Sequence, residues 1–81
     1  MTTKTIIITG LNSDATELAV QSWLGSFGPV VRVEMVRDGN PNLPYALVQM
    51  EISDAAASAL VSRMSHYWHE GAMVSAWLLH H

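Results

Sequence analysis

Apolar and polar residues alternate along the chain in patterns that predict four strands and two helices. Residues 5–9 form a β-branched run that Gly10 ends, which indicates a buried strand. Apolar residues then recur at helical spacing over residues 20–27, and Gly28-Pro29 is expected to end this helix. A second helix is expected after Ser53, which can cap it. The other strands are predicted at residues 30–37, 44–50 and 72–79, with a loop or frayed helix end at 65–71.

This βαββαβ order predicts a single α+β domain over residues 1–81. Two helices between sequential strands, with one hairpin, give a ferredoxin-like sandwich in which both helices cover one face of a four-stranded antiparallel sheet. The opposite face stays open, so function is expected there. On the second strand, alternation directs Val31, Val33 and Met35 toward the core. The residues expected on the open face are Thr5, Ile7, Thr9, Glu34, Val36, Tyr45, Leu47, Gln49, Met73, Ser75 and Trp77.

Composition excludes several classes of protein. The chain has 81 residues, 49% of them hydrophobic, with no cysteine and a formal net charge of −3. Its apolar content is too high and its charge too low for a disordered chain. Without cysteine it has no disulfide framework, Cys-based zinc site or thiol nucleophile. No apolar run approaches the ~18 residues of a membrane span. We therefore expect no membrane partner and a cytoplasmic location, or a nuclear one in a eukaryote.

Catalytic and metal-binding chemistry has little support in the sequence. Serine, histidine and aspartate occur, but none lies in a nucleophile motif or a glycine-rich phosphate cradle. His66 and His69 are spaced to share a helical face, yet beyond Glu70, His80 and His81 no third ligand is apparent. We therefore expect a protein that is not an enzyme and that holds no metal or cofactor.

Four landmarks, in order and over residues 4–79, resemble the RNA recognition motif family. Ile6-Ile7-Ile8-Thr9-Gly10-Leu11 is similar to the six-residue motif of the family's first strand. Phe27-Gly28-Pro29-Val30 is similar to its helix-to-strand turn, and residues 43–50 to the eight-residue motif of its third strand. Residues 71–76 resemble its last turn and strand.

The resemblance implies single-stranded RNA binding on the open face, where aromatic rings stack on bases. The family's three main ring positions correspond to Ile7, Tyr45 and Leu47, of which only Tyr45 is aromatic. The usual cation and glycine that open the eight-residue motif are replaced by Leu43 and Pro44. In this the chain resembles the degenerate domains of polypyrimidine-tract-binding proteins, which bind pyrimidine-rich RNA through hydrophobic side chains, loops and the sheet edge.

The sequence is compatible with two functions, and we favour the first. In an RNA-binding module, Tyr45 and Trp77 would stack on bases, Ile7 and Leu47 would supply apolar contacts, and Lys4, Arg32 and Arg37 would meet phosphates. Three phosphate contacts predict weak binding with a slope of about −2 in log K against log salt concentration. The alternative is a protein-interaction module that binds a partner or a second copy through the same apolar face.

Overall fold

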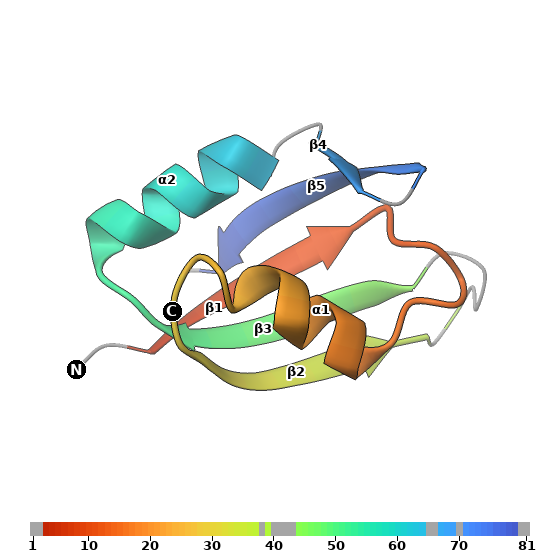
Figure 1. Ribbon diagram of the computed structural model, residues 1–81, viewed down its shortest axis with the longest axis horizontal. Coiled ribbons are helices and arrows are strands. Elements are labelled where there is room, and N and C mark those ends of the chain that lie inside the picture. The colour runs from red at the N-terminus through yellow and green to blue at the C-terminus, as the bar shows by residue number, and fades with distance from the viewer. Residues whose placement is uncertain (1–2, 38, 40–43, 65–66, 70, 80–81) are drawn as a thin grey trace.

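The computed structural model describes residues 3–37, 39, 44–64, 67–69 and 71–79. The described helices are α1 (Glu17–Leu24) and α2 (Asp54–Met64). The described strands are β1 (Thr3–Thr9), β2 (Val30–Val36), β3 (Tyr45–Glu51), β4 (Tyr67–His69) and β5 (Ala72–Leu79). They form an antiparallel sheet in the order β2-β3-β1-β5-β4, with both helices on one face (Figure 1). The predicted ferredoxin-like fold is confirmed, and β4 is a short addition at its edge.

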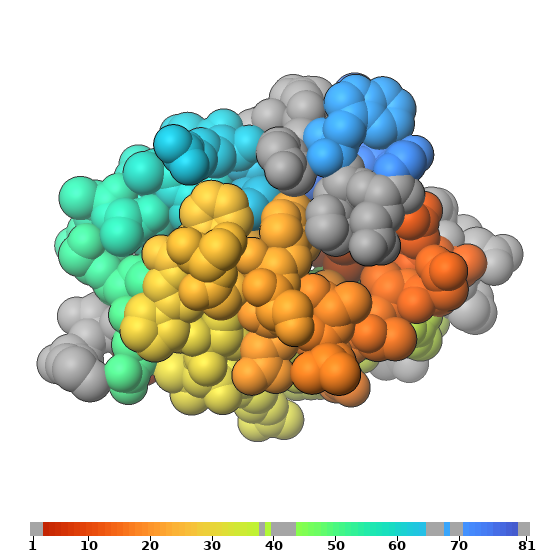
Figure 2. All heavy atoms as spheres, in the orientation of Figure 1, coloured from red at the N-terminus to blue at the C-terminus, as the bar shows by residue number. Residues whose placement is uncertain are grey.

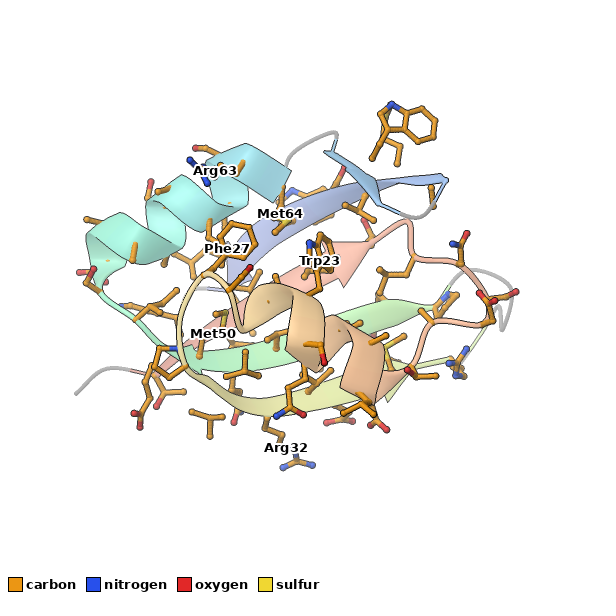
Figure 3. The ribbon with its side chains drawn as sticks, viewed as in Figure 1. Trp23, Phe27, Arg32, Met50, Arg63 and Met64 are labelled. Atoms are coloured by element: carbon orange, nitrogen blue, oxygen red, sulfur yellow. The ribbon has the colours of Figure 1, made fainter. Side chains whose placement is uncertain are left out.

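The hydrophobic core lies between the sheet and the two helices. Every second residue of the central strands is buried and points toward the helices, and burial of each large apolar side chain stabilises the fold by about 1.5–3 kcal/mol. Figure 3 shows Trp23 and Phe27 on this side with Met50 and Met64, and Figure 2 shows the same side closed over by side chains. The buried strand residues are Ile6, Ile8, Ala46, Val48, Met50, Val74 and Ala76.

A side-chain cap begins each helix. Thr16 begins α1, because its hydroxyl accepts a hydrogen bond from the backbone N–H of Ala19 at 3.1 Å. Ser53 accepts the equivalent bond from Ala56 at α2, as predicted. The expected end of α1 at Gly28 is wrong, since Gly25 already caps the helix.

A β-bulge in β2 corrects the predicted direction of Val31. Val30 pairs with Met50 and Arg32 pairs with Gln49, so Val31 is the extra residue between two paired positions. Its side chain is consequently 55% exposed, whereas alternation predicted that it points to the core. Val30 packs against the core instead. Beyond the bulge Val33 and Met35 pack against the core as predicted, and Arg32 and Glu34 are exposed.

The segment 65–71 contains a strand where the sequence predicted a loop or frayed helix end. Residues Tyr67–His69 pair with Val74, Met73 and Ala72 as a short hairpin. Gly71 lies in the turn with a positive φ of 80°, a conformation that favours glycine. Neither helix of the described chain is long and apolar enough to cross a membrane.

Candidate nucleic-acid interface

Strand register aligns four side chains in one row across the open face of the sheet. Glu34 lies opposite Leu47, Leu47 opposite Ile7, and Ile7 opposite Trp77. Directly paired residues share one face of an antiparallel sheet, so these side chains are neighbours. Leu47 and Ile7 are partly exposed, and Trp77 is 54% exposed. The central row, as we call these four residues, is therefore an apolar strip with one carboxylate at its β2 end.

The two candidate stacking rings stand apart on this face. Tyr45 lies two residues along β3 from Leu47, which corresponds to about 7 Å. Trp77 lies on β5, two strands from β3 and therefore about 10 Å across the sheet. The backbones that carry the rings are thus roughly 12 Å apart. Two bases that stack on both rings at once would therefore be unstacked from each other, with Ile7 and Leu47 between the two rings.

Lys4 does not join the open face. It pairs with buried Met50 and lies on the helix side of the sheet. There its ammonium forms an ion pair with the carboxylate of Asp54, the first residue of α2, and its side chain is only 18% exposed. An acidic residue at this helix end is also favoured by the helix dipole. The sequence predicts phosphate contacts for Lys4, Arg32 and Arg37 alike, and the structure does not bring them together.

Arg37 makes a structural contact rather than standing free beside the sheet. Its guanidinium donates hydrogen bonds to the backbone carbonyls of Ser13, at 2.8 Å, and of Ala15. These bonds attach the end of β2 to the segment between β1 and α1. A guanidinium held in this way has less freedom to meet a phosphate.

Removal of the Arg37 contacts should destabilise the fold. We expect Arg37→Ala to lower the free energy of unfolding by about 1–2 kcal/mol, because two charge-assisted hydrogen bonds are lost at a partly solvated site. Arg32→Ala is the matched control and should cost less than about 0.5 kcal/mol, since it breaks only an exposed ion pair. Urea denaturation gives the free energy of unfolding of both variants. Equal decreases in the two variants would contradict a structural role for the Arg37 hydrogen bonds.

Among the cations of the described residues, Arg32 is the one that lies on the open face. Its side chain is 68% exposed, and its Nη2 lies 3.8 Å from Oε1 of Glu34. Figure 3 shows Arg32 projecting from β2, the strand at one edge of the sheet. A hollow of about 70 Å³ lies beside it, and its lining residues are Thr5, Arg32, Glu34, Leu47 and Gln49.

The salt dependence of RNA binding should reflect one cation rather than three. With Arg32 as the phosphate contact, we expect a slope of about −0.7 in log K against log salt concentration. Fluorescence anisotropy of a labelled single-stranded RNA at several salt concentrations measures this slope. A value near the −2 that three phosphate contacts imply would show that both Lys4 and Arg37 leave their described partners to bind RNA.

The sequence does not predict Trp68 on the open face. Trp68 is 64% exposed and pairs with Met73, an open-face residue, so it extends the apolar surface beyond β5. Gly71, a turn residue between two β-rich segments, was the signal that could have revealed this hairpin. A larger hollow of about 740 Å³ lies along α2 and β5, and its lining residues are Asp54, Ser58, Val61, Ser62, Trp77 and Leu78.

Metal ligands do not gather in the described part of the chain: no group of three His, Cys, Asp or Glu side chains lies together there. His66, His80 and His81 lie outside the described residues. Leu43, at the start of the eight-residue motif, also lies outside them, whereas Pro44 is buried.

Comparison with known proteins points to one family. The family model for the RNA recognition motif matches residues 6–68. A search of curated proteins finds no match. Among solved structures, the RRM3 domain of Pes4 aligns with a TM-score of 0.80 at 13% identity, covering 95% of this chain and 92% of that one.

Two further structures show the same fold at similarly low sequence identity. The RRM of Rna15 with bound GU RNA has a TM-score of 0.73 at 16% identity, covering 90% of this chain and 79% of that one. The N-terminal three RNA-binding domains of the yeast splicing factor Prp24 give a TM-score of 0.78 at 16% identity over 90% of this chain. The chain spans 31% of that Prp24 structure.

Proposed function

The chain belongs to the RNA recognition motif family of RNA-binding modules, and we propose that it binds single-stranded RNA on the open face of its sheet. The observation that carries the proposal is the central row, which presents Leu47, Ile7 and Trp77 side by side without a covering helix. Apolar surface of this kind on a small domain marks an interaction site. The proposal assigns no catalytic role to any residue.

Binding would proceed by stacking and apolar contact more than by charge. Each base that stacks on Tyr45 or Trp77 contributes about 1–3 kcal/mol. Ile7 and Leu47, between the rings, remove apolar surface of the RNA from water without reading its sequence. This mode is similar to that of the degenerate polypyrimidine-tract-binding domains, which also lack most of the sheet aromatics. Because Arg32 is the one cation of the described residues that the open face offers to a phosphate, we expect weak binding.

A protein partner or a second copy of this chain is the other occupant that the open face suits. Trp68, Met73 and Trp77 are all exposed on or beside β5, and an apolar surface of this kind favours protein contacts as well as bases. Sedimentation at increasing protein concentration tests self-association. A monomer at all concentrations, together with measurable RNA binding, would favour RNA as the ligand.

Removal of the Tyr45 ring tests the proposal most simply. Tyr45→Ala should weaken binding of a short single-stranded RNA by roughly tenfold, since a stacking contact of about 1–3 kcal/mol is lost. Tyr45→Phe is the matched control, because it keeps the ring and removes only the hydroxyl, and its affinity should stay within about twofold of the parent chain. Fluorescence anisotropy gives both affinities. Equal affinities for Tyr45→Ala and Tyr45→Phe would exclude stacking at this position.

A further inference from the structure

The hollow at the β2 side of the open face brings a cation, a carboxylate and an amide together. Arg32, Gln49 and Thr5 occupy one row of the sheet: Arg32 pairs with Gln49, and Gln49 pairs with Thr5. Glu34 and Leu47 belong to the central row beside it. At about 70 Å³ the hollow is far smaller than the ~300–1,000 Å³ sites that enclose a small molecule. It therefore suits the edge of a flat ligand whose body lies outside.

The polar groups of the hollow are available to a ligand. Arg32 and Glu34 are more than half exposed, and an exposed ion pair at 3.8 Å contributes only about 0–1 kcal/mol to folding. Arg32 presents donors only, Glu34 presents acceptors only, and Gln49 presents both. A ligand that fits must accept a hydrogen bond and donate others along one edge.

The carboxylate of Glu34 distinguishes among RNA bases. A carboxylate on a face that meets phosphates repels RNA unless a base donates hydrogen bonds to it. The Watson–Crick edge of guanine carries the O6 acceptor beside two donor groups, N1–H and N2–H₂. Both oxygens of Glu34 can accept from these donors while Arg32 donates to O6. Adenine, cytosine and uracil each offer a single donor group on that edge, so one carboxylate oxygen would lack a partner.

We infer that this hollow binds the Watson–Crick edge of one guanine, an assignment that rests on the proposed RNA-binding function. Glu34 accepts from N1–H and N2–H, and Leu47 lies beside the base. Arg32 donates to O6 with part of its guanidinium, which has five N–H donors, and the remaining donors serve the phosphate contact. The site would give a preference for guanine at one position to an interface whose other contacts are stacking and apolar. The preferred RNA is then a single strand with a guanosine next to nucleotides that stack on the central row.

The experiment measures the affinity of four short oligouridines that differ at one internal position, where they carry guanosine, inosine, adenosine or uridine. The guanosine RNA should bind roughly tenfold more tightly than the uridine RNA, since a bidentate contact that reads a base discriminates by about this factor. Inosine lacks the N2 amino group, and its RNA should bind several-fold more weakly than the guanosine RNA. Adenosine should bind like uridine.

Glu34→Gln is the variant that tests the carboxylate. It replaces one acceptor oxygen by a donor, so the ratio of guanosine to uridine affinity should fall below about twofold. Glu17→Gln is the matched control: it makes the same charge change at an exposed position on α1, and the ratio should stay near tenfold. Measurable binding of all four RNAs with equal affinity would overturn the guanine site and leave the proposed function standing. Failure of every RNA to bind would overturn both.

Discussion

A carboxylate placed in the middle of the central row, by Leu47→Glu, should weaken binding of single-stranded RNA by at least about tenfold. Leu47 lies between Ile7 and Glu34 in the register of the sheet. The change removes an apolar contact and adds a second negative charge beside Glu34, where phosphates approach. Because Leu47 is only partly buried, the variant should still fold. Fluorescence anisotropy measures the affinity, and circular dichroism checks the fold.

Leu18→Glu is the control for this result. It makes the same substitution and the same change in net charge, but at a position of α1 that is 73% exposed. Its affinity for RNA should stay within about twofold of the parent chain, because α1 lies on the opposite side of the sheet. Equal weakening by both variants would mean that net charge, and not the open face, governs binding. Sedimentation of Leu47→Glu also tests the alternative, since loss of a dimer would indicate self-association.

Gly10→Ala should lower the free energy of unfolding by about 3 kcal/mol or more, a large part of the 5–15 kcal/mol typical of a domain. Gly10 has a φ of +85°, which costs an alanine about 1–2 kcal/mol. An added Cβ would also lie 2.3 Å from the backbone oxygen of Met73. That atom belongs to β5, so β1 and β5 would have to separate near the pair Thr9 and Ser75. Urea denaturation measures the loss.

Gly71→Ala separates the cost of a positive φ from the cost of the steric contact. Gly71 has a similar φ of +80°, but among the described residues, apart from its chain neighbours, no atom lies within 4 Å of an added Cβ. Its substitution should therefore cost only the conformational part, about 1–2 kcal/mol. If Gly10→Ala lowers the free energy of unfolding no more than Gly71→Ala does, the close approach of β1 to β5 does not constrain the turn at Gly10.

The fold could be predicted because each strand and helix has a local signal. The β-branched run of β1 and the alternation in β3 predict which residues of these strands enter the core, as observed for Ile6, Ile8, Ala46, Val48 and Met50. The apolar pair Val30-Val31 fits two registers, and only pairing with β3 decides that Val31 is the bulged residue. Local pattern does not contain that long-range information.

The cations show where prediction of the site fails. Alternation alone places Lys4 on the same side as Ile6, so its helix-side position could have been deduced. The contacts of Arg37 could not be deduced from the sequence, because its partners Ser13 and Ala15 are more than 20 residues away along the chain. The hollow beside Arg32 depends on three strands meeting in one register, which composition and periodicity do not specify.

The central claim is that the open face, and not the helix side, binds single-stranded RNA. A heteronuclear NMR titration with a short single-stranded RNA tests it residue by residue. We predict that the largest amide shifts will lie on β1, β3 and β5, around Ile7, Leu47 and Trp77, with little change on α1 and α2. An absence of shifts at millimolar RNA, or shifts confined to the two helices, would contradict the claim.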